Sequence, residues 1–480
     1  MKRSKKTTRL ITLVCVLAAA CIGTVAVLRH EEKKEQIRSA NEIVLQIPAD
    51  SVTALSWETD ETALSFHKEE NWIYDEDAAF PVDAKKITEL LTPFEALQAA
   101  FIIEEAEDLS QYGLEEPTCT IHLTTADDTA YEIRLGSFST MDAQRYVSIG
   151  DGLVYLLPED PMELYSAQLK DMILNDDPLS YDRIHSISFS GDVDYTIEYE
   201  EDSPAALRED DVYFTDRAGT AVPLDTPSVS TFLSYMTTLK PDDYVTYKVT
   251  EEELTQYGLD EPELTVTVDY SLTPDEEEEI RETYILHIGR NRDDVKAAEE
   301  AMQQAEAEGN EDFIPESVPA YARVGDSSIV YVLSDYDYGM LSAVTFNDLR
   351  HDEVFAADFE AVTSVDVILD GSTYTLTTFT EEDTPVVWKY DEQVVDISAF
   401  QSALMELLAE TFTEETPAGQ EEISLTVHLS DEAHPQIGIS LYRYDGETCL
   451  AQVDGVPFAL VRRSTVVDLM ESVRSIVLKK

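Results

Sequence analysis

Basic residues are scarce in this 480-residue sequence, which has 33 Lys and Arg residues against 98 Asp and Glu residues. Its formal net charge is −65. Phosphate backbones repel a polyanion of this size, so the composition argues against a nucleic-acid partner. The apolar fraction of 43% and the 24 tyrosines indicate a folded chain, and the length suffices for two or three domains.

Histidines and cysteines are also few, with eight and four in the whole sequence. No two histidines have the helical spacing of a metal site, and the cysteine spacing does not match zinc. Cys119 alternates with apolar residues, which predicts a buried free thiol on the inward face of a strand. A Cys119–Cys449 disulfide stays an alternative in an oxidising compartment.

Catalytic motifs are missing as well. The sequence has no Gly-x-Ser-x-Gly elbow, no phosphate-binding Gly-rich loop and no Ca²⁺ loop with its terminal glutamate. His122 and His428 fall at equivalent places on polar strand faces, where we expect solvated side chains, and His434 lies in a loop. Acid pairs are too frequent here for their spacing to identify a glycoside hydrolase. We therefore predict no catalytic residue, no metal and no cofactor.

The only long apolar run extends from Leu10 to Leu28 and follows five basic residues. About 20 residues span a bilayer as a helix, so the run is long enough for a transmembrane helix. The basic flank predicts a cytoplasmic N-terminus and an extracytoplasmic chain after Arg29. We expect residues 1–30 to form the tip and anchor, and residues 31–42 a stalk that is helical from Glu31 to Ala40.

Two other interpretations of the N-terminus stay open. The Ala18-Ala19-Ala20 triplet could be a signal-peptide cleavage site. Cys21 follows small residues, as in a lipoprotein acylation site, although the expected leucine stands one place early at Leu17. Apolar sequence continues to Leu28, which neither interpretation needs, so we favour a retained single-pass anchor.

A Tyr-Gly-Leu-x-x-Pro signature occurs twice, and its members are Tyr112, Gly113, Leu114 and Pro117, then Tyr257, Gly258, Leu259 and Pro262. The glycine supplies the left-handed residue of a Schellman helix ending, and the leucine packs against another leucine five residues before it. The proline prevents any return to helix. We interpret the signature as structural. The alternative is that the two tyrosines lie side by side and grip a ligand.

The signature copies belong to two long segments that share an order of elements, which indicates internal repeats. Three short strands, a helix, the signature, an alternating strand and a strand that ends at glycine follow one another in residues 43–178 and 179–350. Acidic insertions at 273–283 and 293–312 interrupt the second segment, the latter expected as an exposed helix or loop. A degenerate third unit at 351–480 keeps Gly419 but replaces the tyrosine and proline. The expected fold is α+β, with a mainly antiparallel sheet and a packed helix in each unit.

The signature copies, the strand at Trp72, the Pro81-Val82-Asp83 helix start and the strand ending at Gly136 together resemble one bacterial family. That family is known as domain of unknown function forty-three forty. The resemblance implies membrane-anchored extracytoplasmic repeats, some encoded beside ABC transporter subunits and similar to auxiliary components of gliding-motility-type export systems. It implies no catalytic residues.

The favoured function is a non-enzymatic accessory or scaffold protein of the bacterial cell envelope, with a transporter subunit or another envelope protein as partner. The first alternative is a ligand-binding module that uses clefts between units, for a cationic or cell-wall ligand. An envelope-acting hydrolase is the second alternative.

Overall fold

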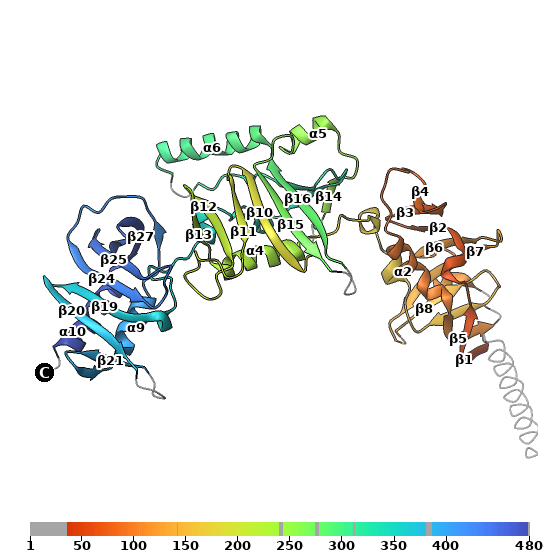
Figure 1. Cartoon of the computed structure of the whole chain (residues 1–480). Coiled ribbons are helices and arrows are strands. Elements are labelled where there is room, and N and C mark those ends of the chain that lie inside the picture. Colours follow the sequence, from red (N-terminus) through yellow and green to blue (C-terminus); the bar gives the residue numbers. More distant parts are fainter. Residues whose placement is uncertain are drawn as a thin grey trace, which may run out of the picture. The chain divides into compact units, whose positions relative to one another are not determined.

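The computed structural model describes residues 36–104, 106, 108–141, 143–239, 243–273, 278–310, 313–380 and 386–478. The predicted membrane anchor, Cys21 and the first part of the predicted stalk lie outside these residues. The chain forms two compact units, Met1–Asp176 and Asp177–Lys480 (Figure 1). Within the described ranges, no helix has both the length and the apolar character needed to cross a bilayer.

Three nine-stranded antiparallel sheets with packed helices make up the protein, so the α+β prediction is confirmed. The first unit contains one sheet and the second unit contains two. The strand orders are β1-β5-β9-β8-β7-β6-β2-β3-β4, β13-β12-β11-β10-β15-β16-β17-β18-β14 and β22-β21-β20-β19-β24-β25-β26-β27-β23.

The first repeat contains nine strands and several short helices. Its elements are β1 (Gln36–Leu45), η1 (Ala49–Ser51), β2 (Val52–Thr59), β3 (Ala63–Lys68), β4 (Trp72–Tyr74), α2 (Ala84–Glu95), β5 (Leu97–Glu104), η2 (Leu109–Tyr112), β6 (Cys119–Thr125), β7 (Ala130–Ser139), β8 (Gln144–Ser148), β9 (Val154–Leu157), α3 (Met162–Tyr165) and η3 (Leu169–Met172).

The second repeat has the same core elements and an additional long helix. Its elements are β10 (Arg183–Gly191), β11 (Tyr195–Tyr199), β12 (Tyr213–Arg217), β13 (Thr220–Pro223), α4 (Thr226–Thr238), β14 (Asp243–Thr246), α5 (Glu251–Gln256), β15 (Leu264–Leu272), β16 (Ile280–Arg290), α6 (Arg292–Ala307), β17 (Ala320–Val324), β18 (Val330–Leu333), α7 (Asp335–Ser342) and α8 (Phe346–Leu349).

The third repeat ends in a long helix. Its elements are η5 (Phe359–Ala361), β19 (Val362–Leu369), β20 (Ser372–Phe379), β21 (Val387–Tyr390), β22 (Gln393–Val395), α9 (Ser398–Met405), β23 (Thr411–Phe412), β24 (Glu421–Leu429), β25 (Gln436–Arg443), β26 (Thr448–Val453), β27 (Val456–Arg462) and α10 (Arg463–Val477).

Strand pairing shows that the three sheets share one arrangement of eight strands, to which β1 is added at one edge of the first sheet and β13 and β22 at the opposite edge of the other two. The opening strand of each repeat pairs with the strand that follows the signature position, namely β2 with β6, β10 with β15 and β19 with β24. Each opening strand also has a register shift near its start, next to Val52, Ile184 and Val362. Because bulges are specific local features, their recurrence supports repeated sheet units independently of the sequence motif.

One helix in each repeat fills the core with the apolar positions that its spacing predicts. In α2 and α4 an aspartate caps the first turn, Asp83 by accepting from the Lys85 N–H and Asp225 from the Ser228 N–H. The buried residues are Ile87, Leu90, Leu91 and Phe94 in α2, and Val229, Phe232, Leu233 and Met236 in α4. In Figure 1, α4 lies against one face of its sheet, while α6 runs along the outside with only Ala305 buried. The prediction of an exposed helix in the acidic insertion is therefore confirmed.

Two helix predictions are wrong in part. Residues 36–40 of the expected helical stalk are strand, because β1 pairs with β5 and satisfies backbone groups at that sheet edge. The helix expected to include Leu407 and Leu408 ends at Met405, and Leu408 is exposed. The helix ends there because backbone groups of the next residues bond outside it. The Leu407 carbonyl accepts from the Val354 N–H, and the Ala409 N–H donates to the Asp352 carbonyl.

Candidate functional site

The two signature turns share one backbone geometry. Gly113 and Gly258 have φ of 66° and 68°. In each copy the leucine N–H donates to the carbonyl five residues earlier, at 3.1 Å in the first copy and 2.8 Å in the second. These are the bonds of a Schellman ending, here on a 3₁₀ turn (η2) and on α5. Leu114 and Leu259 are buried, whereas Leu109 is 39% exposed. In the first copy, therefore, only one of the two leucines of the expected pair is buried.

The signature glycine also lies against a neighbouring strand. A Cβ at Gly258 would be 2.0 Å from the Arg290 carbonyl oxygen, and one at Gly113 would be 2.4 Å from Ser137 Oγ. In the third repeat, a Cβ at Gly419 would be 1.8 Å from the Arg443 carbonyl oxygen, although Gly419 does not have positive φ. Close approach of two backbones therefore explains why this glycine persists where the tyrosine and proline are lost.

Each signature tyrosine contacts a tyrosine of its own repeat. The rings of Tyr112 and Tyr146 lie 5.0 Å apart, and those of Tyr257 and Tyr321 lie 4.6 Å apart. The partners come from the equivalent strands β8 and β17. Pro117 and Pro262 each stand two residues before the strand that follows the signature. The local packing thus accounts for the tyrosine positions within each repeat.

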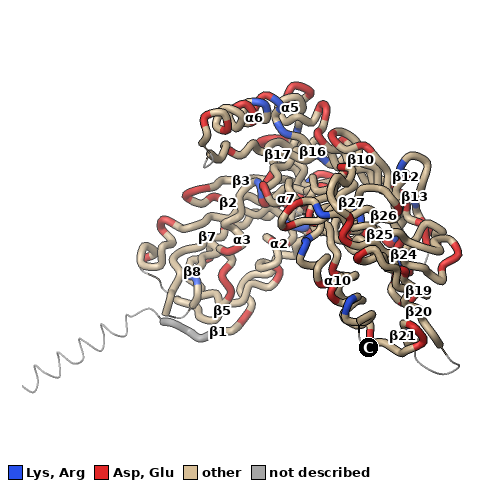
Figure 2. Tube along the Cα trace, turned by 90° about the vertical axis from the view of Figure 1, so that its left-hand side faces the viewer, with Lys and Arg blue, Asp and Glu red and all other residues tan. Residues whose placement is uncertain are grey.

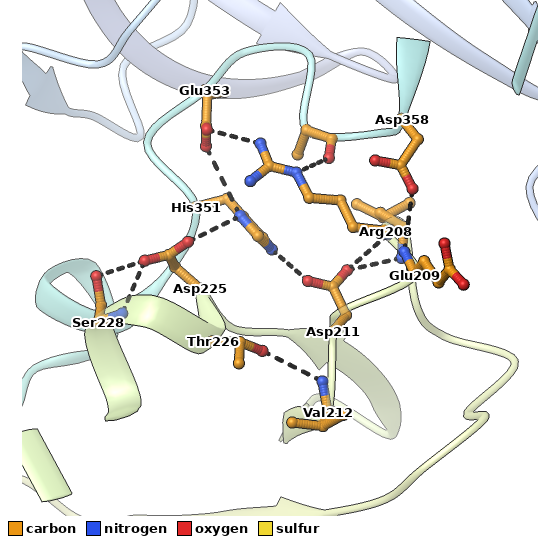
Figure 3. A network of polar contacts seen from close by, with 12 residues as sticks. Arg208, Glu209, Asp211, Val212, Asp225, Thr226, Ser228, His351, Glu353 and Asp358 are labelled. Carbon is orange, nitrogen blue, oxygen red and sulfur yellow. Dashed lines mark hydrogen bonds and ion pairs between the residues drawn. The ribbon is translucent and has the colours of Figure 1, made fainter. Parts of the chain in front are cut away.

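A buried polar network lies in the second unit, where the chain passes from the second repeat to the third (Figure 3). We call its five ionisable residues, Arg208, Asp211, Asp225, His351 and Glu353, the inter-repeat joint. His351 Nε2 lies 2.9 Å from Asp211 Oδ1, and both side chains are almost fully buried. On the other side of the ring, His351 Nδ1 lies 3.6 Å from Asp225 and 3.7 Å from Glu353. The imidazole is surrounded by carboxylates.

Arg208 completes the joint from the loop between β11 and β12. Its Nη2 lies 2.6 Å from Glu353 Oε1, and its Nε donates to the Ala356 carbonyl at 2.7 Å. The backbone N–H groups of Leu207 and Arg208 donate to Asp211, which fixes that carboxylate toward His351. The segment after His351 is tied to the third repeat in turn, because the Val354 N–H donates to the Leu407 carbonyl. The joint therefore links the second and third repeats through the segment between them.

His351 and Glu353 are both charged at neutral pH. Burial would lower the pKa of His351, but the hydrogen bond to Asp211 and the nearby Glu353 carboxylate outweigh burial and raise it to about 9. The proximity of His351 also lowers the pKa of Glu353 to about 2, against the effect of burial. The histidine is thus an imidazolium at neutral pH and does not serve as a base there.

Beside the joint is a cavity of about 1080 Å³, which we call the inter-repeat pocket. Its lining comes from both repeats: β13, α8 and the joint on one side, and β23, β27 and the loop at His434 on the other. Phe346, Phe412 and Phe458 surround the Arg350 guanidinium, whose carbon lies 4.9, 4.5 and 4.5 Å from the three ring centres. Arg217 stacks on the same Phe346 ring at 4.6 Å. This part of the pocket is therefore aromatic and cationic.

That local cation stands out in an acidic chain, since Figure 2 shows Asp and Glu along many segments and far fewer Lys and Arg. Burial, followed by the nearby charge of Arg217, lowers the pKa of Arg350 to about 10. Arg350 is still charged at neutral pH. The two arginines thus provide positive charge in a space that water only partly reaches.

Three predicted histidines have different surroundings. His122 is exposed, as expected. His428 is not simply solvated, because its Nε2 lies 3.0 Å from Asp366 Oδ2 on the neighbouring strand. His434 bridges repeats, with Nε2 3.1 Å from the Pro204 carbonyl oxygen. Cys119 and Cys449 are both free and buried, so the disulfide alternative is not realised.

A serine, a histidine and a carboxylate meet in the second repeat, but not as a catalytic triad. His185 Nε2 lies 3.1 Å from Ser271 Oγ and 3.5 Å from Glu279 Oε1. A triad needs the nucleophile and the acid on opposite ring nitrogens, whereas here both face the same one. No group of three metal-ligating side chains occurs in the part of the chain that the structure describes.

The sequence alone did not predict the joint or the pocket, because their residues come from separate segments of the chain. The one local signal is Arg350-His351, a basic pair at the boundary predicted between the second and third repeats. In a chain with so few basic residues, that position at a repeat boundary could have been singled out.

The sequence model of the family described as "Domain of unknown function (DUF4340)" matches residues 72–203 and 217–424. The search of the curated proteins and the search of the solved structures each found no match. The matched ranges contain both signature copies and Gly419.

Proposed function

Because the chain belongs to the family described as domain of unknown function (DUF4340), we propose that it is a membrane-anchored extracytoplasmic accessory protein that acts by binding. The apolar run from Leu10 to Leu28 is its anchor. Its partner is a subunit of an ABC-type transporter or another complex of the cell envelope. The basic residues before the run and the acidic chain after it support this orientation.

The inter-repeat joint is the observation that carries this proposal. A buried ion-pair network contributes little net stability compared with apolar packing, but breaking it by removing one partner is costly. Its distinctive contribution here is to fix how the second and third repeats are oriented. A scaffold needs such a fixed surface, whereas independent repeats on flexible linkers would not present one.

The histidines beside the pocket favour binding over acid–base catalysis. His351 is protonated between carboxylates, and His434 is engaged with a backbone carbonyl. A hydrolase that used one of these histidines as its general base would need that histidine free near neutral pH. We therefore rank an envelope-acting hydrolase below a binding protein.

Membrane topology and co-purification test the proposal together. In cells that make the full chain with a C-terminal tag, protease added to intact cells or spheroplasts should remove the tag. ATPase and permease subunits encoded beside the gene should co-purify with the chain in mild detergent. Mass spectrometry of the mature N-terminus distinguishes a retained anchor from signal cleavage or lipidation at Cys21. A tag protected until the inner membrane is broken would contradict the proposed topology.

A matched pair of variants connects the partner to the joint. His351→Ala removes the central cation of the joint, while His122→Ala removes an exposed histidine of the first repeat. We expect His351→Ala to reduce recovery of the transporter subunits and His122→Ala to leave it unchanged. Equal recovery with both variants would show that the orientation of the second and third repeats does not matter for the partner.

The second candidate function is a ligand-binding module, and the inter-repeat pocket favours it. A cavity of about 1080 Å³ whose lining combines aromatic and apolar side chains with polar and charged ones is large enough for a small ligand. Its two arginines support an anionic ligand rather than the cationic one that was an initial hypothesis. This function is compatible with an accessory role, since a transporter accessory can hold a ligand or part of one.

A further inference from the structure

Arg350 and Arg217 lie beside each other on one phenylalanine ring, and neither has a carboxylate partner among the described residues. Arg350 contacts three phenylalanine rings, and Arg217 contacts one of the same rings. Arg208 and Arg290 of the same compact unit, by contrast, are paired with Glu353 and Glu263. With 98 acidic residues available, two adjacent guanidinium groups without an acid indicate a place where an anion from outside the chain fits.

The surroundings of the two arginines strengthen their attraction for an anion. Arg350 is partly buried against aromatic rings, so its charge is poorly screened by water. A guanidinium group binds carboxylate or phosphate through in-plane hydrogen bonds from its edge. Arg217 is more exposed and adds charge without much burial.

The carboxylates of the pocket leave this positive region in place. Glu353 is paired with Arg208 inside the joint, and Asp454 accepts the Gly438 N–H at 2.7 Å. Glu414 also lines the pocket and is exposed. It reduces the attraction for an anion, and its removal is therefore informative.

An apolar surface continues beyond the arginines. Val456, at the start of β27, lines the pocket and is 64% exposed, and Val222 of β13 lines it from the other repeat. Exposed apolar side chains within a cavity are typical of surface that a ligand covers. A ligand for this pocket therefore combines an anionic group with an apolar body.

We propose that the inter-repeat pocket binds a small apolar molecule that carries one carboxylate or phosphate group, with the anion at Arg350 and Arg217 and the apolar body along Val222 and Val456. This inference rests on the second candidate function, that of a ligand-binding module. It goes further by assigning the ligand class and the two residues that recognise its charge.

Three compounds with one apolar body test the assignment: 4-phenylbutyrate, 4-phenylbutylphosphonate and 4-phenylbutylamine. Each is titrated calorimetrically into the full-length protein in nanodiscs of zwitterionic lipid, with protein-free nanodiscs as the blank. We expect the two anions to bind and the amine to bind at least tenfold more weakly. The tighter of the two anions identifies carboxylate or phosphate as the preferred group.

Three substitutions locate the binding. Arg217→Gln removes an exposed charge and should weaken carboxylate binding at least fivefold. Glu414→Gln should strengthen it. Arg183→Gln is the matched control, because Arg183 lies in the same compact unit, stacks on Tyr199 at 5.6 Å, pairs with Glu201 and does not line the pocket. Arg350→Gln is added if circular dichroism shows that this variant folds like the wild type.

The outcomes distinguish a pocket that binds no such ligand from a pocket whose charge preference or binding residues differ from those assigned. If none of the three compounds binds, the pocket is not a site for ligands of this kind, and the second candidate function loses its support together with the inference. If the amine binds as tightly as the anions, the pocket accepts ligands but the assigned charge is wrong. If Arg183→Gln weakens binding as much as Arg217→Gln, the effect is a general one of protein charge and the assigned residues are wrong.

Discussion

Three alanine variants can separate two reasons for glycine in the signature turn. Gly258 combines a positive φ of 68° with a neighbouring carbonyl only 2.0 Å from the Cβ position. Gly309 has a similar φ of 71° with no atom within 4 Å, and Gly419 has a close carbonyl without positive φ. All three glycines lie in the second compact unit, so Gly309→Ala and Gly419→Ala each isolate one contribution, and Gly258→Ala combines the two in a comparable setting.

The structure indicates how large each effect should be. Left-handed backbone costs a non-glycine residue about 1–2 kcal/mol. Forcing an additional carbon into a packed region costs about 1–3 kcal/mol. Gly309→Ala should therefore destabilise by about 1 kcal/mol, Gly419→Ala by about 2 kcal/mol, and Gly258→Ala by about the sum of the two effects, ~3 kcal/mol.

Hydrogen–deuterium exchange with peptide mass spectrometry suits this comparison, because a protein with two compact units does not unfold in one step. In the full-length protein, Gly258→Ala should accelerate exchange in β15 and β16, and Gly419→Ala in β24 and β25. Gly309→Ala should change exchange only around the end of α6. If Gly258→Ala and Gly309→Ala have equally small effects, the close approach of the turn to the strand does not constrain the sequence, and the reasoning is refuted.

Two further predictions concern buried ionisable groups. Because the pKa of His351 is raised, its contribution to stability is complete below about pH 6.5 and is lost as pH rises through about 9. Because the pKa of Glu353 is lowered, its contribution to stability is complete above about pH 4.5 and is lost as pH falls toward 2. Exchange in residues 350–358, corrected for intrinsic rates, should therefore be slowest between about pH 4.5 and 6.5 and faster at pH 9.5, with His351→Ala abolishing the alkaline change. Burial raises the pKa of both Cys119 and Cys449 to about 12. At pH 8, both cysteines should therefore resist iodoacetamide in the native protein and react fully in denaturant. Rapid labelling of either cysteine without denaturant would contradict the packing described for it.

Local sequence determined the elements whose signal lies within a few residues of each other. The apolar spacing of Val229, Phe232, Leu233 and Met236 predicts α4, and the alternation after Pro262 predicts β15. Capping chemistry is equally local, and the Thr250–Glu253 capping box is present as predicted. The repeated order of such elements predicted three related sheet units and the family. These features follow from backbone sterics and side-chain periodicity, which neighbouring residues decide.

Only the tertiary structure decided which strands return to the sheet after the helix of each repeat. Sequence reasoning missed β5, β14 and β23, which pair with β9, β18 and β27 at the far side of each sheet. These strands are short or lack strong alternation, so their partners define them. Pairing with β5 likewise explains why residues 36–40 are strand, although their local charge pattern predicted helix. Pairing across long sequence separations outweighs weak local preference.

The inter-repeat joint and pocket depend still more on the tertiary structure. Asp211 and His351 are 140 residues apart in the chain, and Arg350 meets Phe412 and Phe458 only because the second and third repeats pack into one unit. No residue spacing encodes such a meeting, since the sequence pattern of each repeat describes its own core. The pKa of His351 likewise follows from the carboxylates that folding places around it. The sequence alone therefore determined the repeats, while the packing between two of them created the candidate site.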